Sequence, residues 1–125
     1  MCIPALEKAT RTGIIPQMSD WKAAYQKELQ LAFAARERKN EGQARVCARR
    51  AAGIVIREYY RNLGMPINTP SAYDLLKIFM DDESQPEALR QSAAYLTLRV
   101  SEEFKLPVEV DLVEEAESIA QGLFP

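Results

Sequence analysis

The chain has 125 residues, of which 47% are hydrophobic and 27% charged, and its formal net charge is −2. This length fits one domain that buries a core without disulfides or metal, and the composition argues against disorder over most of the chain. Glycine is scarce and alternating β-branched stretches are almost absent, which predicts an all-α fold. No apolar run approaches the roughly 18 residues that a transmembrane helix needs, so no transmembrane helix is expected. The two cysteines suggest no disulfide framework, and the first residues lack the apolar core of a signal peptide, which together predict a cytoplasmic protein.

Residues 1–18 are expected to form an N-terminal arm, and residues 19–125 a single helical-bundle domain. The first predicted helix starts near Ser19, a good N-cap, and runs to about residues 39–40. Its apolar stripe consists of Trp21, Ala24, Tyr25, Ala32 and Ala35. The short link after it predicts that the next helix returns antiparallel.

Residues 41–64 are predicted to form one long helix around which the others pack. At 100° per residue, one side consists of Ala44, Cys47, Ala48, Ala51, Ile54, Val55 and Tyr59. The other side carries Arg45, Arg49, Arg50, Arg57 and Arg61, with Gly53, Ile56 and Tyr60 among them. Gly53 is expected to mark a close crossing and Gly64 to end the helix. Glu58 is expected at a helix–helix rim, with a buried polar contact as the alternative.

Three further helices are predicted after this segment. Ser71 is expected to cap the third, which ends in an acidic turn at residues 81–83 that we expect to be solvated. Ser84 is expected to cap the fourth, whose apolar spacing continues to Phe104, and Asp111 to cap the fifth. The predicted architecture is an up-and-down bundle of four long helices plus one shorter helix.

The chain has no histidine. This removes the most usual general base near neutral pH, the histidine-containing metal sites and the nucleophile–histidine pairs. No phosphate-binding loop, dinucleotide fingerprint or nucleophile elbow is present in the sequence. We therefore expect no catalytic residues, no metal and no cofactor, and the sequence favours a protein that is not an enzyme.

The arginine side of residues 41–64 is a candidate anion-binding surface. Residues 36–61 carry a local charge of +5, whereas the rest of the chain sums to −7. Guanidinium groups bind phosphates bidentately, and a tyrosine ring stacks on a base. The candidates for an anion or nucleic-acid site are Arg45, Arg49, Arg57, Arg61 and Tyr60. The alternative is a solvated face whose cations pair with acidic neighbours.

The small-residue side of the same helix has two interpretations. The simpler is that it forms the core of the bundle. The functional one is that it forms a homodimer seam together with the apolar surplus in the first and last helices. The two interpretations are compatible, because a small bundle often buries a leftover apolar stripe against a symmetry mate.

The order of elements from about residue 20 to 124 resembles the HEPN family (higher eukaryotes and prokaryotes nucleotide-binding), which consists of small, commonly dimeric helical bundles. The segment Glu41-Gly42-Gln43-Ala44 is similar to the family's turn into its second helix, and Ala72-Tyr73-Asp74-Leu75-Leu76 to a segment that often reads His-Asp-Leu. The family-position candidates are Tyr73, Arg90, Tyr95 and Arg99. The family's ribonuclease motif is an arginine followed by histidine, so this chain is expected to lack that activity.

The resemblance implies a non-catalytic nucleotide-, RNA- or protein-binding module, commonly a homodimer. One alternative is a homodimeric interaction partner of a nucleotidyltransferase-like protein, with no nucleic-acid binding. Another is a ribonuclease that works without histidine.

Overall fold

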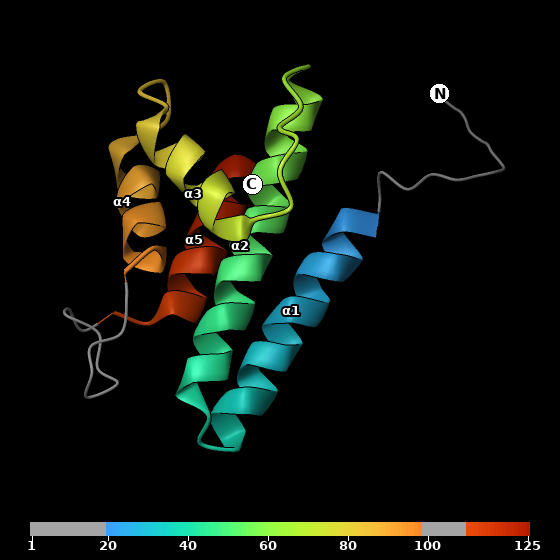
Figure 1. Cartoon of the computed structure of the whole chain (residues 1–125), viewed down its shortest axis with the longest axis vertical. Helices are drawn as coiled ribbons and strands as arrows, with labels where there is room; N and C mark the ends of the chain where they lie inside the picture. The colour runs from blue at the N-terminus through green and yellow to red at the C-terminus, as the bar shows by residue number, and fades with distance from the viewer. Residues whose placement is uncertain (1–19, 99–109) are drawn as a thin grey trace, which may run out of the picture.

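The computed structural model describes residues 20–98 and 110–125, so the proposed N-terminal arm and the proposed Ser19 cap lie outside it. This part of the chain contains five α-helices and no strand, which confirms the all-α prediction (Figure 1). In order they are α1 (Asp20–Glu37), α2 (Glu41–Asn62), α3 (Ala72–Asp81), α4 (Glu87–Leu96) and α5 (Leu112–Leu123). None of these helices is both long and apolar enough to cross a membrane.

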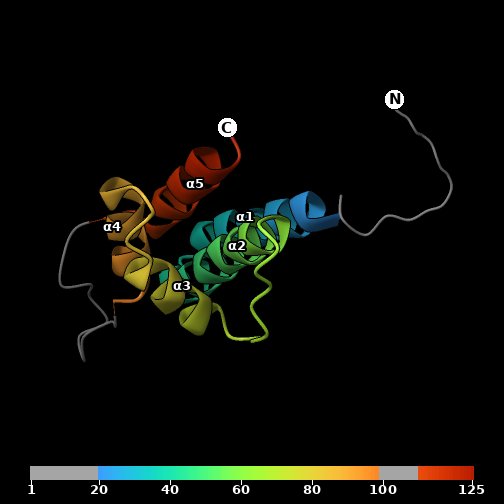
Figure 2. The same cartoon turned by 90° about the horizontal axis from the view of Figure 1, so that it is seen from above.

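Helix α2 is the centre of the bundle and contacts each of the other four helices. Viewed from above, it lies between α5 on one side and α3 on the other, with α1 alongside it (Figure 2). Ala48, Ala51 and Val55 are fully buried. Small side chains here let the neighbouring helices approach closely. The core interpretation of this side of α2 is therefore confirmed.

The first two helices form the predicted antiparallel hairpin (Figure 1). Helix α1 ends at Glu37, slightly earlier than predicted, and Lys39 takes a left-handed φ of 65° in the turn. The side chain of Asn40 then accepts a hydrogen bond from the backbone N–H of Gln43 at 3.1 Å and caps α2. Gly64 follows the C-cap residue of α2 in the left-handed conformation, with φ of 77°, and terminates the helix as predicted.

Gly53 lies where α3 crosses α2. A Cβ built on Gly53 would meet the Cβ of Ala72 at 3.0 Å and its Cα at 3.2 Å, so the glycine permits the close approach that the sequence predicted. The side chain of Ser71 caps α3 by accepting from the backbone N–H of Asp74 at 3.2 Å, as expected.

In the acidic turn after α3, Asp81 and Glu83 are exposed as predicted, whereas Asp82 is partly buried and hydrogen-bonded. Asp82 accepts hydrogen bonds from Tyr60 Oη, Ser84 Oγ and Gln85 Nε2 at 2.5, 2.6 and 3.2 Å. The Ser84 hydroxyl therefore donates to this carboxylate and does not cap α4. The N-cap residue of α4 is Pro86, which makes no side-chain hydrogen bond. The difference arises because α4 begins at Glu87, two residues later than a Ser84 cap requires.

Helices α4 and α5 complete the bundle. Helix α4 ends at Leu96, short of the predicted extent, and Val100 and Phe104 lie outside the described residues. Asp111 caps α5 as predicted, accepting from the backbone N–H of Val113 at 3.0 Å. The same carboxylate accepts from Arg36 Nη1 and Nη2 at 3.2 and 3.1 Å, which ties the start of α5 to the end of α1.

Candidate anion-binding site

The arginines of α2 fall into two groups that face different neighbours. At about 100° per residue, Arg45 and Arg49 lie about 40° apart, whereas Arg50 and Arg61 lie within about 40° of Arg57. Arg49 of the first group bonds to the C-terminal end of α4, and the second group borders the loop between α2 and α3. The structure therefore does not present the predicted arginine side as one continuous surface.

Arg49 is used to hold α4. Its Nε donates to the carbonyl oxygen of Leu96 at 2.6 Å, and its Nη2 donates to that of Leu98 at 2.9 Å. A cation at this position satisfies carbonyls that have no partner at a helix C-terminus and complements the helix dipole. Burial lowers the pKa of Arg49, and the nearby charge of Arg45 lowers it further. With these donors already in use, Arg49 is poorly placed to bind an external phosphate.

Arg45 lies beside Arg49, half-buried on the same stripe of α2. Its Nε is covered by protein and has no hydrogen-bond partner within the described parts of the chain. The nitrogen is closed off from solvent, so it offers no accessible donor to a ligand.

Tyr60 is a core residue, with 3% of its surface exposed. Its hydroxyl donates to Asp82, and its ring packs edge-on against Tyr59 with centroids 5.5 Å apart. The expectation that Tyr60 offers its ring to a base is corrected by this burial. The physical reason is that α3, α4 and the turn between them cover a second side of α2, which a helical wheel with one buried face does not anticipate.

The second arginine group borders open space. Arg57 Nη2 donates to the carbonyl oxygen of Thr69 at 2.8 Å, which orients the guanidinium across the loop that follows α2. A hollow of about 750 Å³ lies there, lined by Arg57, Arg61, Pro66, Ile67, Asn68, Thr69 and Pro70. A smaller hollow of about 230 Å³ shares Arg57 and Pro70, and adds Arg50 and Glu28 to its lining. Arg57 thus stands between two adjoining hollows, each with a second arginine.

Glu58 partly balances this positive charge. Its Oε1 lies 3.5 Å from Arg61 Nη1, and the residue is only 5% exposed. The predicted rim position for Glu58 is therefore wrong, and the alternative of a buried polar contact holds. The side chain of Arg61 remains 53% exposed, so its guanidinium is accessible from solvent.

The family-position candidates do not assemble into one site in the described part of the chain. Tyr73 is 41% exposed on α3, with Lys77 Nζ 5.9 Å from its ring centroid. Arg90 Nε donates to the carbonyl oxygen of Met80 at 2.9 Å, which closes the end of α3. Tyr95 is half-buried against the core, and Arg99 lies outside the described residues.

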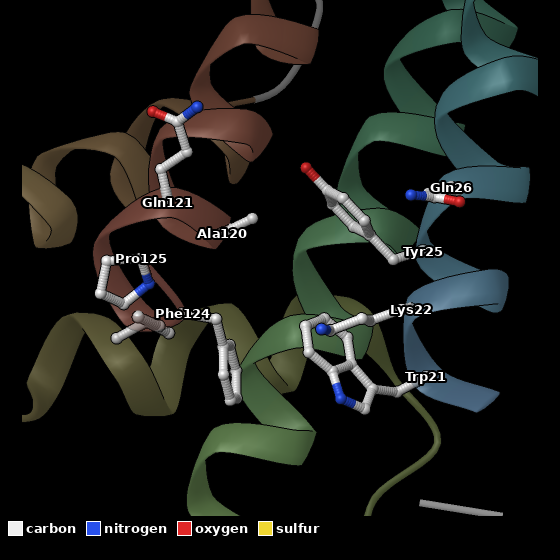
Figure 3. Close-up of a pocket in the computed structure, with 9 residues that line it drawn as sticks. Trp21, Lys22, Tyr25, Gln26, Ala120, Gln121, Phe124 and Pro125 are labelled. Carbon is white, nitrogen blue, oxygen red and sulfur yellow. The ribbon is translucent and has the colours of Figure 1, made fainter. Parts of the chain in front are cut away.

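A second, aromatic groove lies between α1 and α5 (Figure 3). Trp21, Lys22 and Tyr25 of α1 face Ala120 and Phe124 of α5 across it. The rings of Trp21 and Phe124 touch at one end, with centroids 4.6 Å apart. The groove measures about 560 Å³. Burial raises the pKa of the Tyr25 hydroxyl, and the charge of Glu117 raises it further, so this hydroxyl stays protonated at neutral pH.

Sequence reasoning missed two parts of these surfaces. Arg50 was placed on the arginine side but not among the candidates, although its spacing of seven and eleven residues from Arg57 and Arg61 put the three on one stripe. Trp21 and Tyr25 are predicted only as part of the apolar stripe of the first helix, and not as the walls of a groove. No group of three or more His, Cys, Asp or Glu residues that could hold a metal ion occurs in the residues the structure describes.

Comparison with known protein families, with curated proteins and with solved structures gives no match.

Proposed function

We propose that this chain is a non-catalytic, HEPN-like binding module for a nucleotide or RNA, and that Arg57 and Arg61 hold the ligand's phosphate. The proposal includes the HEPN-like bundle of four long helices with one shorter helix, and a cytoplasmic location. The observation that carries it is the position of Arg57 between two adjoining hollows that also expose Arg61 and Arg50.

Three features support a phosphate ligand at this position. The Thr69 carbonyl fixes the direction of the Arg57 guanidinium, so less conformational entropy is lost when it binds. Arg61 is exposed and lies about one turn further along α2. The hollow beside them lies within the size range of small-molecule sites, and Ile67 and two prolines give it apolar walls against which a base can lie.

The test is a titration of the full chain with a fluorescently labelled single-stranded RNA and, separately, with a labelled adenine nucleotide at several salt concentrations. Each phosphate contact to a single strand contributes about 0.7 to the slope of log K against log salt. The double variant Arg57→Ala/Arg61→Ala is expected to weaken RNA binding at least about tenfold and to lower that slope by about 1.4.

The matched control is Arg38→Ala, which removes one exposed arginine near the α1–α2 turn, away from both hollows. It is expected to leave binding within about twofold, since surface cations remote from a site act only through screened long-range charge. RNA binding that is equally strong in the double variant and the control would reject the Arg57–Arg61 site. The same RNA, recovered intact from metal-free and magnesium-containing buffers, would also exclude a ribonuclease that works without histidine.

A protein-interaction module without nucleic-acid binding is the second candidate, and the aromatic groove between α1 and α5 favours it. Trp and Tyr are enriched at protein interfaces because each combines a large apolar area with one polar group. The proposed partner is a nucleotidyltransferase-like protein encoded by a neighbouring reading frame. Co-expression of the two chains tests this: a complex that Tyr25→Ala disrupts and Arg57→Ala leaves intact would support it, and separate elution would reject it.

A further inference from the structure

Helix α1 is an outer helix, and one of its edges is exposed along its whole length. The residues of this edge are Lys22, Gln26, Gln30, Phe33 and Glu37, and each of them is exposed. At 100° per residue they fall within an arc of about 80°, and they span about 22 Å along the axis. We define these five residues as the α1 edge.

The α1 edge borders the aromatic groove at one end and carries an exposed aromatic ring at the other. Lys22 and Gln26 line the groove together with Trp21 and Tyr25 (Figure 3). Phe33, two turns further along α1, is 46% exposed. The same edge therefore presents a hollow with aromatic walls and, about 10 Å away, a ring that none of the described residues covers.

These features are self-complementary under a two-fold rotation. If a second copy of α1 packs antiparallel with the axis between residues 29 and 30, position 26 of one copy faces position 33 of the other. Phe33 of each copy then enters the aromatic groove of the other. In the same arrangement Lys22 faces Glu37 of the second copy, so opposite charges meet at both ends. A two-fold interface requires that the same patch serve both copies, and this edge fulfils the requirement.

We propose that the α1 edge is a homodimer interface, in which Phe33 of each copy fills the groove between α1 and α5 of the other. Among residues 20–98 and 110–125, the groove is open beside Lys22 and Gln26, and Phe33 of the second copy closes it in this arrangement. The interface shares no residue with the Arg57–Arg61 site, so those two proposals stand or fall separately. It uses the same groove as the second candidate function, so a homodimer here excludes a partner protein from that groove. One helix edge and one groove form a small interface, for which a dissociation constant on the order of 10 µM is expected.

The experiment is analytical ultracentrifugation of the full chain over a wide concentration range. The wild type is expected to be dimeric at about 100 µM. Phe33→Arg is expected to weaken the dimer at least about tenfold, because it removes the ring that fills the groove and brings a second cation beside Lys22 of the other copy. Leu31→Arg is the matched control, because Leu31 is 44% exposed but lies on the opposite edge of α1. It is expected to leave the dimer unchanged. Circular dichroism checks that each variant is folded.

Charge reversal identifies the antiparallel register. Lys22→Glu and Glu37→Lys are each expected to weaken the dimer about threefold or more, because each brings like charges together. The double variant Lys22→Glu/Glu37→Lys restores opposite charges and is expected to return to within about twofold of the wild type. In a Cys2→Ser background, Gln30→Cys lies next to the axis and is expected to form an intermolecular disulfide under mild oxidation.

Three results would overturn the proposal. The first is a wild type that stays monomeric at about 200 µM. The second is a dimer that Phe33→Arg and Leu31→Arg affect equally, which would place the interface elsewhere. The third is a charge-reversal double variant that is no tighter than the single variants, which would reject the register.

Discussion

The hydroxyl of Tyr60 on α2 donates a hydrogen bond to the carboxylate of Asp82, 2.5 Å away, in the turn between α3 and α4. Asp82 also accepts from the hydroxyl and the backbone N–H of Ser84. The bonds from Ser84 and Tyr60 hold the pKa of the Asp82 carboxyl well below its usual range, although burial opposes this. Burial, followed by the bond to Asp82, raises the pKa of Tyr60. One ionised carboxylate thus joins the central helix to the connection between two others.

Removing the Tyr60 hydroxyl is expected to destabilise the fold without opening a cavity. Tyr60→Phe keeps the buried ring but loses a hydrogen bond to a charged group, so the free energy of unfolding should fall by about 1.5 kcal/mol. The measurement is urea denaturation, in which the midpoint should fall while the slope m stays constant. Tyr73→Phe is the control, since Tyr73 is exposed, and its effect is expected within about 0.5 kcal/mol. Equal effects of the two substitutions would contradict a stabilising role for the Tyr60–Asp82 bond.

Acid is expected to reduce the contribution of Asp82 to the free energy of unfolding. The folded pKa of Asp82 lies below the unfolded value of about 3.9, so its contribution is fully present above about pH 4. This contribution of Asp82 to the free energy of unfolding is lost as pH falls through the folded pKa, because the carboxylate is then protonated in the folded state as well. Asp82→Asn should therefore reduce the loss of stability between pH 5 and pH 2, measured by urea midpoints at each pH.

The control for this pH series is Asp81→Asn, which alters the exposed neighbour of Asp82. Asp111, whose pKa is also lowered as the Arg36 bonds outweigh burial, contributes in the same direction in every variant. In Asp82→Asn, the free energy of unfolding is therefore still expected to rise with pH between pH 2 and pH 5. An acid slope that is the same in Asp82→Asn and Asp81→Asn would refute the assignment.

Two glycines of α2 are expected to respond oppositely to alanine. At Gly42 the nearest atom to an added Cβ is Asn40 Oδ1 at 3.8 Å, so Gly42→Ala gains helix propensity and should stabilise by about 0.5–1 kcal/mol. At Gly53 the added Cβ presses on the Cα and Cβ of Ala72, which cannot rotate away. Gly53→Ala should therefore lose that gain and destabilise by about 1 kcal/mol through displacement of α3. Thermal melts compare the two, and a more stable Gly53→Ala variant would argue against the close crossing.

Most features that depend on local geometry could be predicted from the sequence, and the Ser84 cap is the exception. The caps at Ser71 and Asp111 form within three residues of the capping side chain, and the turn at residues 38–40 is fixed by its shortness. The buried alanines of α2 follow from spacing alone, because a small-residue stripe on a long helix must be covered by something. The all-α class follows from the same periodicity.

The features that depend on how many neighbours a helix has could not be predicted in this way. A helical wheel gives the direction of each side chain but not how much of the circumference is covered. Since α2 contacts all four other helices, Ile56 and Tyr60 are buried although they lie among arginines in the sequence. The division of the arginines follows from the same cause: α4 ends beside Arg49, and the loop after α2 passes beside Arg57. Neither position can be read from the spacing within α2.

Arg49 is expected to stabilise the end of α4 and to contribute little to ligand binding. Arg49→Met keeps the aliphatic packing but removes the donors to Leu96 and Leu98. The free energy of unfolding should therefore fall by about 2 kcal/mol. Relative to the wild type, amide hydrogen exchange should increase most in the last turn of α4, where these carbonyls lose their hydrogen-bond donors. Arg50→Met is the matched control, because Arg50 is exposed on the same helix, and its effect on stability should stay within about 0.5 kcal/mol. If Arg49→Met instead left stability and exchange unchanged but abolished RNA binding, Arg49 would belong to the ligand site and not to the fold.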